Sequence, residues 1–94
     1  MSREELRERD ARLDAAQHYY ESHQQALEEE KAKVYSLAQQ KSQKGENIDA
    51  ELQKYNELKR QQNNNFDNYK AERDRICAEY ENRKEKEYQE ELSM

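Results

Sequence analysis

The sequence predicts an all-α fold, an antiparallel coiled-coil hairpin of two long helices. Three observations support this prediction: a charged, helix-forming composition, a seven-residue apolar repeat, and a single glycine near the middle of the chain. Charged residues make up 41% of the 94 residues and hydrophobic residues 32%, and there is no proline. This balance is typical of long helices and coiled coils, and it contains too few aliphatic residues for a compact core.

The apolar repeat begins at Leu6 and keeps one register as far as Arg83. Large apolar or aromatic side chains at every seventh position keep one stripe of a helix against one partner, which is the pattern of a coiled coil. Disorder would not maintain such a period. The members of the series that we expect in the helix–helix interface are Leu6, Leu13, Tyr20, Leu27, Val34, Ile48, Tyr55, Tyr69 and Ile76.

A coiled coil needs a second row beside the first, and the spacing of this row changes at Gly45. Before Gly45 the better second row lies three residues after the series, and after Gly45 it lies four residues after. A parallel coiled coil would treat this exchange as a register discontinuity, whereas an antiparallel hairpin produces it because each layer pairs an a position with a d position. The members of the second row that we expect in the interface are Leu37, Leu52, Phe66 and Tyr80.

The hairpin predicts which residues face each other. If the chain folds so that facing residue numbers sum to 89, Leu37 lies opposite Leu52 and Glu30 lies opposite Lys59. The axis of this fold falls beside Gly45, so the layers and the turn indicate the same architecture.

Local signals predict the turn at residues 42–47. Gly45 suits the left-handed position just past a helix end, Lys44 is a cation where a helix C-terminus favours one, and Asn47 is a good N-cap. We therefore expect one coiled-coil element over residues 1–94, with helices over about 2–43 and about 48–92.

The alternative fold is one continuous helix in a parallel dimeric coiled coil. The heptad series crosses Gly45 in phase, and a glycine within a helix costs only about 1 kcal/mol relative to alanine.

Composition argues against several function classes. The net charge is −5, with Lys and Arg mixed among Glu and Asp, so there is no basic face and we expect no nucleic-acid partner. No apolar run approaches the roughly 20 residues that span a bilayer, so we expect no membrane association. The N-terminus lacks the apolar segment of a signal peptide, and the one cysteine, Cys77, fits a reducing compartment, so we expect a cytoplasmic location.

No pattern of catalytic residues is visible, so we expect no enzyme activity and no cofactor or metal. The only two histidines, His18 and His23, are five residues apart, a spacing that does not place two ligands on one helix face. The acidic residues alternate with Lys and Arg at helical spacing, as in Glu29 and Lys33, which is typical of a solvated helix surface.

Three function hypotheses remain. The first is a structural and protein-interaction hairpin, acting as a rigid arm, spacer or docking finger, with a protein partner or with self-association, including a homodimer. The second is a continuous parallel coiled-coil rod of a cytoskeletal or centrosomal scaffold. The third is an adaptor that holds a small folded partner, such as ubiquitin or a small GTPase, on a helix face around Tyr69 to Tyr80.

Overall fold

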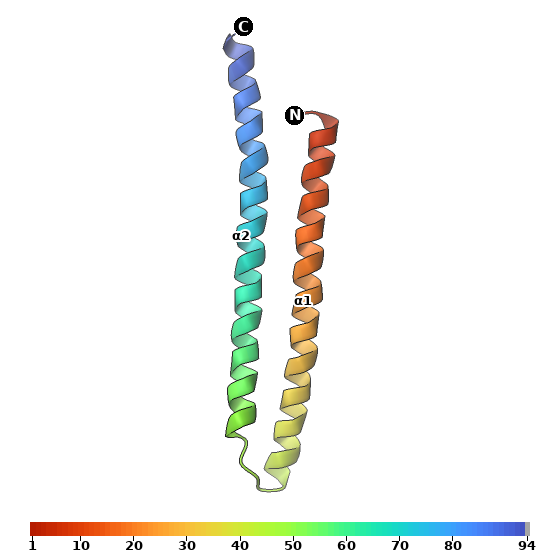
Figure 1. Cartoon of the computed structure of the whole chain (residues 1–94), viewed down its shortest axis with the longest axis vertical. Coiled ribbons are helices and arrows are strands. Elements are labelled where there is room, and N and C mark those ends of the chain that lie inside the picture. Colours follow the sequence, from red (N-terminus) through yellow and green to blue (C-terminus); the bar gives the residue numbers. More distant parts are fainter. Residues whose placement is uncertain (94) are drawn as a thin grey trace. The chain divides into compact units, whose positions relative to one another are not determined.

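The computed structural model describes residues 1–93 and consists of two α-helices with a short turn between them (Figure 1). Helix α1 covers Arg3–Gln43 and helix α2 covers Asp49–Ser93, and no strand occurs in this part of the chain. The predicted all-α helical hairpin is confirmed. The break between Gln43 and Asp49 decides against a single continuous helix.

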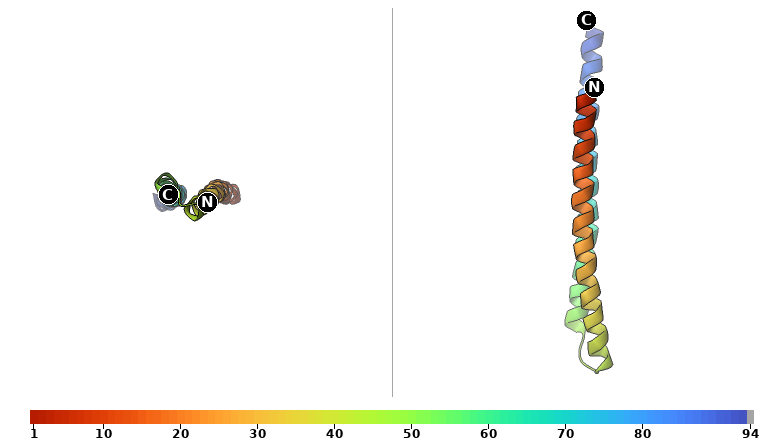
Figure 2. Two further views of the ribbon diagram at one scale, coloured as in Figure 1. Left: turned by 90° about the horizontal axis from the view of Figure 1, so that it is seen from below. Right: turned by 90° about the vertical axis from the view of Figure 1, so that its right-hand side faces the viewer.

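The chain divides into two compact units. The first unit comprises Met1–Tyr19 with the described part of Asn68–Met94, and the second comprises Tyr20–Asp67. We call these the terminal unit and the turn unit. Each contains a segment of α1 and a segment of α2, and in the turn unit the views in Figures 1 and 2 agree that the two segments lie side by side.

The end of α1 is closed by backbone hydrogen bonds around a left-handed glycine. Gly45 has φ +72°. Its N–H donates to the Ser42 carbonyl at 3.1 Å, and the N–H of Glu46 donates to the Lys41 carbonyl at 2.9 Å. These two bonds form a Schellman motif, which satisfies carbonyls that the helix end leaves without partners.

Helix α2 begins at a side-chain cap. The Oδ1 atom of Asn47 accepts a hydrogen bond of 2.8 Å from the N–H of Asp49, the first residue of the helix. Asp49 and Glu51 lie in the first turn, where negative charge stabilises the positive end of the helix dipole.

The first row of the helix–helix interface follows the predicted series. In the turn unit Leu27 is buried, and Tyr20, Val34, Ile48 and Tyr55 are partly buried. In the terminal unit the remaining members of the series are buried or partly buried: Leu6, Leu13, Tyr69 and Ile76.

The second row differs from the expectation. Leu37, Leu52 and Phe66 were expected in the interface, but their exposed fractions are 45%, 48% and 50%. In the turn unit each helix is rotated by one position, so that in α1 the second row lies four residues after the series and in α2 it lies three residues after. The row consists of Gln24, Lys31 and Ala38 in α1 and of Glu51, Leu58 and Asn65 in α2.

The physical reason for this difference is cross-helix pairing. The row that the structure buries contains more polar residues than the row that it exposes, but its polar members reach partners on the other helix, as Asn65 does with Gln24 at 3.0 Å. A buried polar group with a partner costs little, and this rotation also buries Leu58 to an exposed fraction of 1%. The spacing of the second row still changes at Gly45, as an antiparallel hairpin requires. It changes from four residues in α1 to three in α2, which is the reverse of the predicted order.

Neither helix, over the described residues, contains an apolar stretch of the length that a bilayer crossing requires.

The turn gives a first testable prediction. We expect Gly45→Ala to lower the free energy of unfolding by about 1–2 kcal/mol, because a Cβ disfavours the left-handed conformation. A Cβ at Gly45 would have nothing within 4 Å, so the loss measures backbone strain and not a steric clash. Urea denaturation followed by circular dichroism provides the measurement. Gly45→Asn is the control and should lose less, because asparagine tolerates this conformation; equal stability of Gly45→Ala and wild type would contradict the assignment.

Candidate functional site

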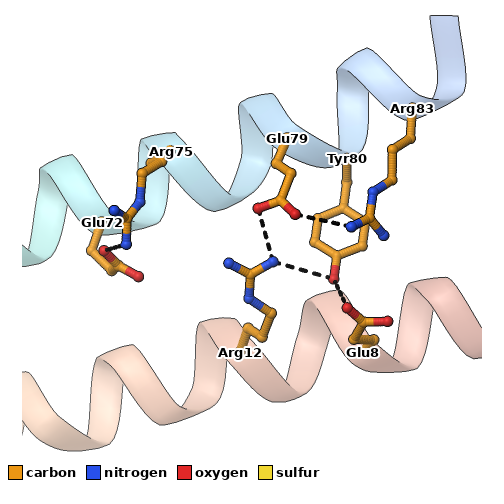
Figure 3. A network of polar contacts seen from close by, with 7 residues as sticks. All are labelled: Glu8, Arg12, Glu72, Arg75, Glu79, Tyr80 and Arg83. Carbon is orange, nitrogen blue, oxygen red and sulfur yellow. Dashed lines mark hydrogen bonds and ion pairs between the residues drawn. The ribbon is translucent and has the colours of Figure 1, made fainter. Parts of the chain in front are cut away.

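The candidate site is the polar part of the helix–helix interface, and its largest cluster surrounds Tyr80 in the terminal unit (Figure 3). The exposed fraction of Tyr80 is 1%, and its hydroxyl donates a hydrogen bond of 2.8 Å to Oε1 of Glu8 on α1. The side chain of Arg12 donates to Oε2 of Glu79 at 2.9 Å, and Arg83 donates to the other oxygen of this carboxylate, also at 2.9 Å. One carboxylate therefore links an arginine of each helix.

The two guanidinium groups also lie against the tyrosine ring. The Cζ atom of Arg83 is 4.6 Å from the centroid of the Tyr80 ring, and that of Arg12 is 5.7 Å away. Both distances are within the range of a cation–π attraction. The ring is thus held by packing, by its hydroxyl and by two cations.

These contacts change the acidities of two groups. Hydrogen bonding by Arg12, assisted by the positive charge of Arg12 and of Arg83, lowers the pKa of Glu79 against the opposing effect of desolvation. Hydrogen bonds to Tyr80 and then to Glu79 raise the pKa of Arg12. Since Glu79 and Arg12 remain 39% and 36% exposed, solvent screens the pair.

In the turn unit, Gln62 occupies the centre of a second polar cluster. Its exposed fraction is 8%. Its Nε2 donates to Glu28 at 2.6 Å, and its Oε1 accepts from Lys31 at 3.1 Å. Lys31 and Glu28 also form an ion pair of 3.2 Å. Hydrogen bonds from Gln62, and then from Lys31, lower the pKa of Glu28.

Two further buried polar residues have partners across the interface. The side-chain amide of Asn65 donates to Oε1 of Gln24 at 3.0 Å and to the backbone carbonyl of Tyr20 at 3.2 Å. Glu51 forms an ion pair with Lys41, and the hydrogen bond from Lys41 lowers the pKa of Glu51. The interface therefore carries specific polar pairs along its length in the turn unit.

Aromatic rings lie along one edge of the turn unit. The Nζ atoms of Lys31 and Lys59 lie 5.7 and 5.6 Å from the centroid of the Tyr55 ring, and the Tyr35 ring is 6.3 Å away at a tilt of 47°. Further along, Phe66 packs edge-on against Tyr20 at 6.1 Å. These contacts place Tyr35, Lys59 and Phe66 on the same flank of the interface.

The structure brings most of the predicted interface residues together and leaves three outside. Within the turn unit, Leu37, Leu52 and Phe66 are half exposed at the edges of the interface, and Lys44, Gly45 and Asn47 form the turn. The residues that sequence reasoning missed are buried or partly buried members of the second row: Gln24, Lys31, Ala38, Glu51, Leu58, Asn65, Glu72 and Glu79. Matching polar residues whose numbers sum to 89, as Gln24 and Asn65 do, would have found one such layer.

No group of three potential metal ligands among His, Cys, Asp and Glu lies close together within residues 1–93. The single cysteine, Cys77, is exposed and free. A shallow surface hollow runs along the last turns of α2 and is lined by residues of that helix alone, from Asn82 to Ser93.

Comparison with protein-family models, with curated proteins and with solved structures finds no match for the chain.

The Tyr80 hydroxyl can be tested by a double-mutant cycle. We expect Tyr80→Phe to lower the free energy of unfolding by about 1 kcal/mol, because the 2.8 Å hydrogen bond to Glu8 and the longer one of 3.5 Å from Arg12 are lost while the ring stays buried. In a Glu8→Ala background the same substitution should cost much less, since the acceptor is already absent. Tyr88→Phe, at an exposed tyrosine of the same helix, is the control and should change little. Additive effects of Tyr80→Phe and Glu8→Ala would refute the coupling.

The lowered pKa of Glu79 predicts a pH dependence. Its pKa is lower in the folded state than in the unfolded chain, where a glutamate titrates at about 4.3. Its contribution to stability is therefore present above that value and is lost as the pH falls through the folded-state pKa. We expect Glu79→Gln to melt at a lower temperature than wild type at pH 7, and this difference to vanish at acidic pH. Thermal melts from pH 7 to pH 3 provide the measurement. Glu81→Gln, at an exposed glutamate nearby, is the control, and a pH-independent difference for Glu79→Gln would contradict the role of its charge.

Proposed function

We propose that this protein is a non-catalytic coiled-coil hairpin that acts through protein–protein contacts, as an arm, spacer or docking finger in a cytoplasmic assembly. The observation that carries this proposal is the polar interface between the helices. Gln62, Asn65 and Tyr80 are almost fully buried, and each makes hydrogen bonds to the other helix.

Buried polar pairs of this kind favour one alignment of two helices over others. An apolar pair of helices can slide by a heptad with little loss, whereas a polar layer must find its own partner again after such a shift. A protein whose role is to present residues at set positions benefits from this property.

The exposed aromatic and aliphatic residues provide surfaces that a partner could cover. Their exposed fractions range from 45% for Leu37 to 74% for Tyr19. Tyr88 and Leu92, one helical turn apart in the last turns of α2, are 61% and 70% exposed. Aromatic side chains such as those of Tyr19 and Tyr88 are enriched where proteins bind each other.

The adaptor hypothesis receives less support. The helix face from Tyr69 to Tyr80 was its expected binding surface. Ile76 and Tyr80 are each only 1% exposed, because both pack toward α1 within the terminal unit. A partner on this face would contact mainly charged residues such as Arg73 and Asp74.

Site-specific photo-crosslinking tests the proposal. A photoreactive phenylalanine analogue replaces Tyr19, Leu37 or Tyr88, and the purified variants are added to an extract of the cells from which the sequence comes. We expect one defined protein to be crosslinked from at least one of these positions, because exposed apolar side chains are the natural contacts of a partner. Ser22, which is exposed and polar, is the control position.

A second variant shows whether the folded hairpin is needed. Leu58→Lys places an unpaired charge in the interface and should unfold the turn unit. We expect it to abolish the crosslinks. Crosslinking that is equal at all positions, or that persists in Leu58→Lys, would count against a structured docking element.

A further inference from the structure

The turn unit has one flank that is more apolar than the other. Of its four exposed large hydrophobic residues, Tyr35, Leu52 and Phe66 lie on one flank and Leu37 lies on the other. The contacts of the Tyr55 ring with Tyr35 and with Lys59 mark the first flank. We call the surface formed by Glu28, Tyr35, Leu52, Lys59 and Phe66 the Tyr35 face.

The opposite flank is marked by a charged pair. Glu30 of α1 and Lys54 of α2 approach to 3.6 Å across the helices. In an antiparallel coiled coil the g positions of the two helices meet on one flank and the e positions meet on the other. The buried rows are the a and d positions, and counted from these rows, Glu30, Leu37 and Lys54 are g positions. We call these three residues the Leu37 face.

The Tyr35 face consists of e positions, which have a distinct meaning in helical proteins. A two-helix coiled coil buries only a and d positions, whereas helices of a larger bundle bury e or g positions as well. Apolar residues at e positions in both helices, Tyr35 in α1 and Leu52 and Phe66 in α2, are therefore typical of helices in a larger bundle.

The charges of the Tyr35 face are self-complementary. Asn65 lies opposite Gln24, so Lys59 lies opposite residue 30 and close to Glu28 in height along the helix axis. In the same way Tyr55 lies beside Tyr35, so Leu52 is close to Tyr35 in height. A two-fold axis parallel to the helices would bring α1 of one copy against α2 of the other at equal levels. Glu28 would then face Lys59 of the second copy, and Tyr35 would face its Leu52, with both contacts made twice.

The two charged groups are available for this arrangement. Lys59 has no ion pair within residues 1–93, and its Nζ lies over the Tyr55 ring. Glu28 is 62% exposed and keeps one carboxylate oxygen, Oε1, apart from its contacts with Gln62 and Lys31, both of which involve Oε2.

We infer that the Tyr35 face is the contact surface for a second copy of this chain, and that two turn units associate in parallel as a four-helix bundle. Neighbouring helices are antiparallel throughout this bundle, so α1 packs on α2 both within and between copies. The same patch serves both copies, as a closed two-fold dimer requires. This inference deepens the proposed interaction function, because it names the partner of one face.

A charge-exchange experiment tests the arrangement. Lys59→Glu places two glutamates opposite each other at both contacts of a homodimer, and Glu28→Lys places two lysines there. We expect each variant alone to weaken dimerisation about tenfold or more, and an equimolar mixture of the two to restore it, because every contact in the mixed dimer again pairs opposite charges. Sedimentation equilibrium of the whole chain over a range of concentrations measures the association, and circular dichroism verifies that each variant is folded.

Two exposed leucines supply a matched control. Leu52→Ser removes an apolar contact from the Tyr35 face and should weaken the dimer, whereas Leu37→Ser, at a residue of nearly equal exposure on the Leu37 face, should leave it unchanged. In a Cys77→Ser background, a mixture of Tyr35→Cys and Leu52→Cys chains should form the mixed disulfide in preference to either symmetrical one.

The outcomes separate this inference from the proposed function. A chain that stays monomeric at all concentrations overturns the second-copy inference, and so does a dimer that Leu37→Ser weakens as much as Leu52→Ser. Neither result removes crosslinks to another protein from Leu37 or Tyr88, which test the proposed function alone. A dimer with mixed-charge rescue supports the inference even if no such crosslink forms.

Discussion

The structure depends on one constraint: a polar residue buried between two helices needs a partner on the other helix, and even Glu51, whose Oε2 is buried without a hydrogen bond, has one in Lys41. Two helices alone enclose only a narrow apolar strip, and in this chain much of that strip is polar. The cost of burying Gln62 and Asn65 is offset because Glu28, Lys31 and Gln24 lie at matching levels of α1. The alternative rows contain Leu37, Leu52 and Phe66, which the structure leaves 45%, 48% and 50% exposed. The pairing thus selects which rows of residues face inward.

This constraint also explains what the sequence could and could not predict. The heptad series, the turn and the antiparallel direction can be predicted from local rules. The effects of Gly45, of Asn47 and of a seven-residue repeat depend only on residues close in sequence. The second row follows from pairs that are distant in sequence, such as Asn65 with Gln24. Apolar content alone predicts that the row of Leu52 and Phe66 is buried. It fails for Leu58, because the row that contains Leu58 also contains polar residues. Tyr80 is different, because its ring is apolar and its hydroxyl donates a hydrogen bond to Glu8. Apolar content and polar pairing therefore both predict that Tyr80 lies in the helix–helix interface.

The second row of α1 also changes its spacing within the helix. It lies three residues after the series at Arg9 and Ala16, and four residues after the series from Gln24 onward. Two successive steps of four, from Ala16 to Tyr20 and from Tyr20 to Gln24, form a stutter, which locally alters coiled-coil winding. The stutter coincides with the division between the terminal unit and the turn unit at Tyr19 and Tyr20.

The choice of buried rows explains why several apolar residues are exposed. A residue such as Leu52 that is excluded from a two-helix interface has not lost its hydrophobicity, and the free energy of covering it remains available to another surface. The preference of the interface for paired polar groups therefore moves apolar side chains to the flank, where they can serve association. In this chain the alignment of the two helices and the grouping of exposed apolar residues on one flank have the same origin. The polar pairs align α1 with α2, and the same rotation that satisfies them places Tyr35, Leu52 and Phe66 together on one outward face.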